Sequence, residues 1–120
     1  MALAMADYVP GDVIWANLDP TQGSEQAGRR PVVVVSSELY NESVPNVLIV
    51  VPVTTAERNW PTRVLLQGAD LNLELASYAM TEQPRTVDRK RFGRPSGRVD
   101  EATLDKIRRN LARFLDLPSA

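Results

Sequence analysis

Two short runs of branched apolar residues most constrain the fold of this 120-residue chain. The first begins at Pro31 and continues through four consecutive valines to Ser37, and the second extends from Asn46 to Val51. Runs of this length and composition are typical of strands buried on both faces of a sheet. We therefore expect two central strands here, with Pro52 marking a bulge or a strand edge because proline cannot donate to a ladder.

Shorter apolar segments, separated by Pro and Gly, predict the rest of the sheet. Further strands are expected at residues 12–18, 62–66, 77–81 and 83–87. The last two are either separate strands or one strand bent at Pro84. A helical turn is expected at residues 38–42. Five to seven short strands and one terminal helix favour a mostly β fold, a small barrel closed by a C-terminal α-helix. The length predicts a single domain over residues 1–120.

The terminal helix is the clearest element in the sequence. Asp100 is suited to cap it, and Glu101 favours its first turn. Apolar residues then recur at helical spacing and form one stripe, which predicts a helix packed on the sheet. The stripe comprises Leu104, Ile107, Leu111 and either Phe114 or Leu115.

The chain contains neither cysteine nor histidine. The first absence excludes disulfides, thiolate nucleophiles and Cys-based zinc sites. The second removes the usual general base and a leading metal ligand. We therefore expect no metal and no cofactor. The N-terminal residues have neither the charge nor the length of an export signal or a membrane span, which predicts a cytoplasmic protein.

Charge is distributed unevenly, although the formal net charge is only −1. Residues 1–60 hold three basic and seven acidic side chains, whereas residues 61–120 hold eleven basic and eight acidic ones. Six basic residues and a single acid fall within the Gly- and Pro-containing segment 85–98. Such a cluster is typical of a phosphate-binding surface, and a solvated loop explains it equally well.

The candidate chemistry lies in a loop predicted for residues 21–30 and at the end of the second valine run. The loop carries Glu25, Gln26, Arg29 and Arg30, and the run is followed by Thr54 and Thr55. Guanidinium groups bind phosphate and stabilise charge on phosphoryl oxygens. RNA carries its own nucleophile, the 2′-hydroxyl, so these residue types suit RNA cleavage without histidine or metal. An ordinary surface connection remains the alternative for the loop.

Several short motifs occur in a fixed order along most of the chain. They are GDVIW (11–15), LDP (18–20), GSEQAG (23–28), RP (30–31), PVTT (52–55) and EQPRTVD (82–88). This ordered set, with the closing helix, resembles the MazF/PemK-type toxins of type II toxin–antitoxin systems. The resemblance implies an SH3-like (CcdB/PemK-type) barrel that forms a homodimer. It also implies a sequence-specific, metal-independent endoribonuclease, which cleaves single-stranded RNA to a 2′,3′-cyclic phosphate and a 5′-hydroxyl and is neutralised by a cognate antitoxin.

Residue roles follow from the same resemblance. Arg30 matches the family's catalytic arginine and Thr54 its catalytic threonine, while Glu25 matches a carboxylate important in some members. Arg30 is expected to neutralise the scissile phosphate and is a candidate for protonating the leaving 5′-oxygen. Glu25 is expected to orient Arg30 or to act as the base. The expected RNA-binding residues are Gln26, Arg29, Thr55, Gln83, Arg85 and Arg89. Close relatives can carry histidine where this chain has Arg29, which favours an arginine–threonine mechanism.

Two other functions fit the same barrel. Toxins resembling CcdB poison DNA gyrase without cleaving RNA, and Arg30 would then be dispensable. A catalytically silent module would bind RNA and leave it intact. Trp15 is expected in the core, whereas Trp60 is suited either to stacking on a base or to packing against the barrel.

Overall fold

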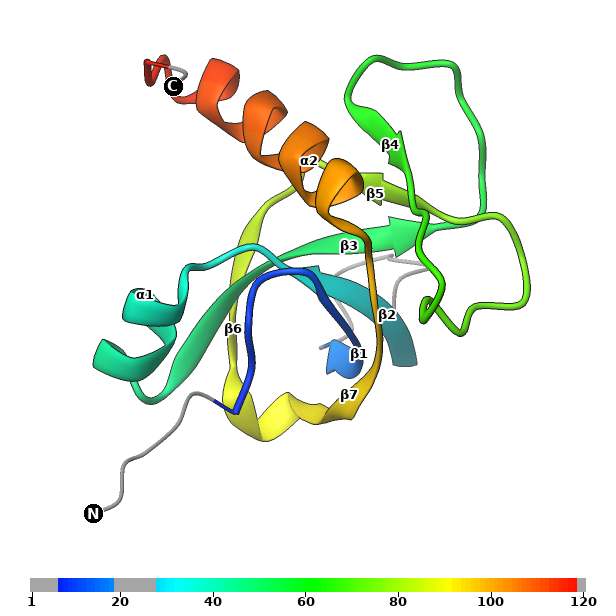
Figure 1. The fold of residues 1–120 in the computed structure, drawn as a ribbon. Helices are drawn as coiled ribbons and strands as arrows, with labels where there is room; N and C mark the ends of the chain where they lie inside the picture. The colour runs from blue at the N-terminus through cyan, green and yellow to red at the C-terminus, as the bar shows by residue number, and fades with distance from the viewer. Residues whose placement is uncertain (1–6, 19–27, 119–120) are drawn as a thin grey trace.

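The computed structural model describes residues 7–18 and 28–118 (Figure 1). Its elements, in chain order, are β1 (Asp12–Leu18), β2 (Gly28–Val34), α1 (Glu38–Ser43), β3 (Val47–Thr54), β4 (Arg63–Leu65), β5 (Tyr78–Met80), β6 (Arg85–Asp88), the short 3-10 helix η1 (Arg89–Arg91), β7 (Phe92–Arg98) and α2 (Glu101–Phe114). The mostly β fold with a C-terminal helix is confirmed.

The strands form one antiparallel sheet in the order β4-β5-β3-β2-β1-β7, and β6 pairs with β3 off this path. The strands curve around a common interior, and α2 lies across one side of it (Figure 1). Over the described residues the sheet ends at β4 and β7, which do not pair. The prediction of a barrel is therefore only loosely met, because hydrogen bonding leaves the sheet open.

Both valine-rich runs form strands, as predicted, and these strands, β2 and β3, pair with each other. Val32 lies opposite Pro52, Val33 opposite Val51 and Val34 opposite Val50. Successive valines point alternately into two apolar clusters. One cluster also contains Val13, and the other also contains Ile14 and Leu48. All three β2 valines are fully buried. Both faces of this pair are thus covered, as the unbroken apolar runs predict.

Pro52 does not end the second run, because β3 continues through it to Thr54. The strand changes partner at this point instead. Its pairing with β6 ends at Val50, and its pairing with β5 begins at Val53. Pro52 lies between the two ladders, where a missing backbone donor costs little.

Two sequence predictions are corrected by strand pairing. The predicted loop at 21–30 gives way at Gly28 to β2, because the β1 ladder extends as far as the pair Leu18–Gly28. The basic segment 85–98, treated as a possible solvated loop, contains β6, η1 and β7. The strand β7 pairs with the outer edge of β1 through two register shifts, and these irregularities accommodate Pro95.

The helix α2 forms as its sequence predicts. Asp100 caps it by accepting a 2.8 Å hydrogen bond from the Thr103 backbone N–H. Hydrogen bonds from Thr103 hold the pKa of the Asp100 carboxyl below its ordinary value. Leu104 and Ile107 are buried, whereas Phe114 at the end of the stripe is half exposed. No helix in the described part of the chain has the length and apolarity required to span a membrane.

Gly97 of β7 supports a first prediction, because backbone from another segment lies against its α-carbon. A Cβ here would lie 2.6 Å from the Asp70 carbonyl oxygen and closer still to that of Leu71. Gly97→Ala is expected to lower the free energy of unfolding by about 1–3 kcal/mol, as overpacking does. Gly93→Ala on the same strand is the control, because the nearest atom to its new Cβ, in the Arg29 side chain, would be 3.7 Å away. Equal denaturant midpoints for the two variants would contradict the prediction.

Candidate functional site

A cavity of about 490 Å³ opens where β2, β3 and the loop before β5 meet. Its polar lining includes the guanidinium side chain of Arg30 and the hydroxyls of Thr54 and Thr55. The lining residues within the described part of the chain are Trp15, Arg30, Pro31, Val53, Thr54, Thr55, Asn72, Leu73, Glu74, Leu75 and Ser77. Three of the residues predicted from sequence are therefore brought to one site.

Strand register explains why Arg30 and Thr54 meet. The β2–β3 ladder pairs Val32 with Pro52. Continuing this antiparallel register by two residues places Arg30 opposite Thr54. A cation and a hydroxyl from segments 24 residues apart in the sequence thus face one cavity.

The Thr54 hydroxyl is oriented by its own backbone. Its Oγ1 accepts a 3.1 Å hydrogen bond from the Ala56 backbone N–H. A hydroxyl carries one hydrogen and two acceptor lone pairs. With one lone pair engaged, Thr54 retains its hydrogen for donation to an anionic oxygen in the cavity.

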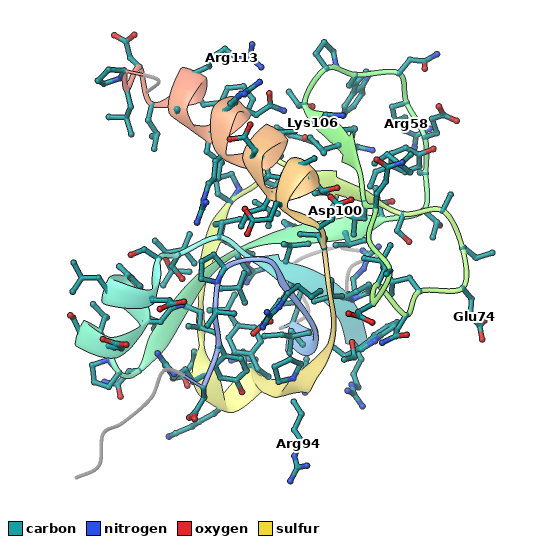
Figure 2. All side chains as sticks on the ribbon, viewed as in Figure 1. Arg58, Glu74, Arg94, Asp100, Lys106 and Arg113 are labelled. Carbon is teal, nitrogen blue, oxygen red and sulfur yellow. The ribbon has the colours of Figure 1, made fainter. Side chains whose placement is uncertain are left out.

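Arg30 is half-buried at the cavity wall. Within residues 7–18 and 28–118, no hydrogen bond or ion pair engages its guanidinium group. Among the described lining residues, Arg30 is the only cationic side chain and Glu74 the only acidic one. Glu74 is exposed on the loop after β4, at the rim of the site (Figure 2).

The loop at 72–77 was missed by sequence reasoning, which left residues 71–76 unassigned. Leu71, Leu73 and Leu75 alternate with polar residues here, a pattern typical of a strand rather than of a loop. The Asn72 side chain ties it to β7 by donating a 2.8 Å hydrogen bond to the Ser96 carbonyl oxygen. The loop therefore completes the cavity through a tertiary contact rather than through a motif.

Arg29 does not line the cavity, although it precedes Arg30 directly. Its guanidinium group lies instead near Gly93 of β7. Glu25 and Gln26, the remaining residues predicted from this segment, lie outside the described residues.

The other predicted RNA-binding residues also lie away from the cavity. Gln83 is exposed in the turn between β5 and β6, and Arg85 pairs with Val50 at the start of β6. Arg89 donates to the Asn41 carbonyl oxygen and lies 5.7 Å from the centroid of the Tyr8 ring. Arg89 thus anchors α1 and the N-terminal segment.

No metal centre is apparent where the structure describes the chain, since no three His, Cys, Asp or Glu side chains cluster there. The candidate site combines one guanidinium group and an apolar wall with other polar side chains, which belong to Thr54, Thr55, Asn72, Glu74 and Ser77. This arrangement suits an oxyanion such as a phosphodiester, because guanidinium and hydroxyl donors both bind phosphoryl oxygens.

Comparison with known proteins gives a consistent result. Residues 9–115 match the family described as PemK-like, MazF-like toxin of type II toxin–antitoxin system. The chain is 37% identical over 112 residues to endoribonuclease MazF9 of Mycobacterium tuberculosis, covering 89% of this chain and 95% of that protein.

Solved structures share the fold. MazF from Deinococcus radiodurans superimposes with a TM-score of 0.74 at 30% identity, over 92% of this chain and 99% of that one. A mycobacterial endoribonuclease in complex with its cognate antitoxin gives a TM-score of 0.74 at 26% identity, over 94% and 99%.

The Thr54–Ala56 hydrogen bond supports a second prediction. Thr54→Val keeps the shape of the side chain but removes the acceptor for the Ala56 N–H. We expect the free energy of unfolding to fall by about 0.5–1.5 kcal/mol, the usual net value of one hydrogen bond. Thr54→Ser retains the oxygen and is expected to be closer to wild type in chemical denaturation. A Val variant as stable as the Ser variant would show that this hydrogen bond contributes nothing.

Proposed function

This chain belongs to the PemK-like, MazF-like toxin family of type II toxin–antitoxin systems, and we propose that it is an endoribonuclease acting on single-stranded RNA. The observation that carries the proposal is the cavity in which β2 and β3 bring Arg30 and Thr54 together. Donors of this kind bind a phosphodiester and stabilise the charge that builds up on it during cleavage.

The proposed reaction is an internal transesterification. The 2′-hydroxyl loses its proton and its oxygen bonds to the adjacent phosphorus, while the bond from phosphorus to the 5′-oxygen breaks. The products are a 2′,3′-cyclic phosphate and a 5′-hydroxyl, whose oxygen takes up one proton. No metal enters this scheme, because the substrate supplies the nucleophile and the protein supplies position and charge stabilisation.

Each site residue has a distinct part in the proposal. Arg30 neutralises the non-bridging phosphoryl oxygens and is the candidate donor of the proton to the 5′-oxygen. Thr54 donates its hydroxyl hydrogen to a phosphoryl oxygen. This hydrogen is available because Thr54 Oγ1 acts only as the acceptor in its hydrogen bond from the Ala56 N–H. Glu25 is proposed to orient Arg30 or to accept the 2′-hydroxyl proton.

The remaining predicted residues are proposed to position RNA. Thr55 lies in the cavity beside Thr54 and is suited to contact the nucleotide next to the scissile bond. Gln83, Arg85, Gln26 and Arg29 are proposed to bind nucleotides further along the RNA. Of these, Gln83 is proposed to contact a base. Arg89 is the weakest candidate, because its guanidinium group is already engaged by Asn41 and Tyr8.

We propose further that the chain acts as a single domain in a cytoplasmic homodimer that a cognate antitoxin inhibits. The antitoxin complex of a mycobacterial relative supports the last part. Relatives described as endoribonucleases favour RNA cleavage over the gyrase-poison function. A silent RNA-binding module is the outcome against which cleavage must be tested.

The direct test is incubation of the purified protein with a long mixed-sequence RNA, followed by mapping of the cleaved bonds. Cleavage is expected to persist in EDTA. It is expected to cease at a mapped site when the 2′-hydroxyl there is replaced by hydrogen, and the ends formed should be a 2′,3′-cyclic phosphate and a 5′-hydroxyl. Continued cleavage of the deoxy substrate would exclude attack by the 2′-oxygen. If the RNA stays intact under all conditions, the result would contradict the proposed cleavage and favour gyrase poisoning or RNA binding without cleavage.

The role of Arg30 is tested by substitution. Arg30→Ala is expected to lower kcat/KM at the mapped site at least about 10²-fold, the usual effect of losing one donor to a developing oxyanion. Arg94→Ala is the matched control, because Arg94 extends away from the body of the protein (Figure 2). Thermal unfolding of both variants establishes that they fold. A folded Arg30→Ala protein with wild-type activity would remove Arg30 from the mechanism.

A further inference from the structure

A second recess lies beside the cavity, on the loop between β3 and β4. Its volume is about 340 Å³, within the roughly 300–1,000 Å³ typical of small-ligand pockets. At its edge stands Trp60, whose side chain is 50% exposed. The recess is lined by Glu57, Arg58, Asn59, Trp60, Pro61, Arg63, Leu65 and Tyr78.

Trp60 rests on a buried arginine. The guanidinium carbon of Arg63 lies 4.5 Å from the indole ring centroid, which is cation–π geometry. The Arg63 side chain is only 9% exposed. The Arg63 backbone N–H also donates a 3.0 Å hydrogen bond to the Trp60 carbonyl oxygen. The indole is therefore held at a defined position while half of its surface remains open to solvent.

Arg63 is itself fixed by two further contacts. Its Nε lies 3.1 Å from Glu82 Oε2, and its Nη1 donates a 3.2 Å hydrogen bond to the Ala56 carbonyl oxygen. A planar guanidinium group bound through several donors loses little further freedom when a ligand arrives. The platform beneath Trp60 is thus preorganised.

The same contacts connect Trp60 to the proposed active site. Ala56 accepts from Arg63 through its carbonyl and donates to Thr54 Oγ1 through its N–H. Tyr78, which lines the recess, lies opposite Thr54 in the β3–β5 ladder. The recess and the cavity are therefore on adjoining parts of the surface, joined by a rigid segment.

The chemistry of the recess suits a nucleobase. An aromatic face stacks on any base, whatever its hydrogen-bonding edge. Arg58 on the loop (Figure 2) supplies an exposed cation beside the carboxylate of Glu57, whereas the charge of Arg63 is compensated by its ion pair with Glu82. An apolar ligand would gain nothing from the Arg58 cation.

We propose that Trp60 forms a stacking subsite for a base that flanks the scissile bond, with the Arg63–Glu82 pair and the Ala56 hydrogen bonds setting its position relative to Thr54. This inference rests on the proposed function, since it needs RNA in the cavity. It assigns Trp60 to substrate binding rather than to packing, because half of the side chain contacts no protein.

The test combines protein variants with abasic RNA. First, the cleaved bond is mapped with the wild-type protein. Single abasic nucleotides then replace each residue flanking that bond in turn, and kcat and KM are measured for the wild type, Trp60→Ala and Trp60→Phe. Leu39→Ala is the matched control, because Leu39 is a large exposed apolar side chain on α1, distant in sequence from the recess.

Wild type is expected to show one flanking position at which loss of the base raises KM about ten-fold or more, the effect of losing one base–aromatic stack. Trp60→Ala is expected to raise KM similarly on intact RNA and to be insensitive to the abasic change at that position. Trp60→Phe, which keeps an aromatic face, should restore most of the sensitivity, and Leu39→Ala should match wild type.

Two results would overturn the inference. One is an abasic penalty of equal size in wild type and Trp60→Ala, which would show that the lost base does not contact Trp60. The other is an unchanged KM of Trp60→Ala on intact RNA, which would show that Trp60 does not contribute to RNA binding. Failure of the wild type to cleave any RNA would instead refute the proposed function.

Discussion

The antiparallel pairing of β2 with β3 is the interaction on which the rest of the structure depends. Its valines face apolar clusters on both sides of the sheet, so this pair of strands joins the two halves of the core. Extended by two residues beyond its last pair, Val32–Pro52, the same register brings Arg30 opposite Thr54. Core packing and site geometry thus have a single cause.

The change of partner along β3 determines where the site opens. β6 covers the first half of the strand and β5 the last two residues, with Pro52 between them. Arg30 near the start of β2 and Thr54 at the end of β3 line the cavity together with residues of the loop before β5. The segment after Thr54 then returns through Ala56 and Trp60 to β4. Arg63 holds this segment in place from a nearly buried position.

Much of the fold was predictable from local pattern. The valine runs, the Asp100 cap and the apolar stripe of α2 all agree with the structure, because burial and capping leave clear periodic signals. The strand β7 was not predictable, because Gly93, Pro95 and Gly97 break every strand pattern. It forms only because β1 presents an unpaired edge and Gly97 admits the backbone of residues 70–71.

The candidate site divides in the same way. The sequence by itself determined which chemical groups are present: guanidinium groups, threonine hydroxyls and carboxylates, without cysteine or histidine. It also identified Arg30 and Thr54 through their motifs. Only the tertiary structure decided which of these groups share a cavity, because that depends on strand register and on the face toward which each side chain points. It separated Arg29 from Arg30, engaged Arg89 with Asn41, and linked Trp60 to Thr54 through hydrogen bonds that no sequence spacing encodes.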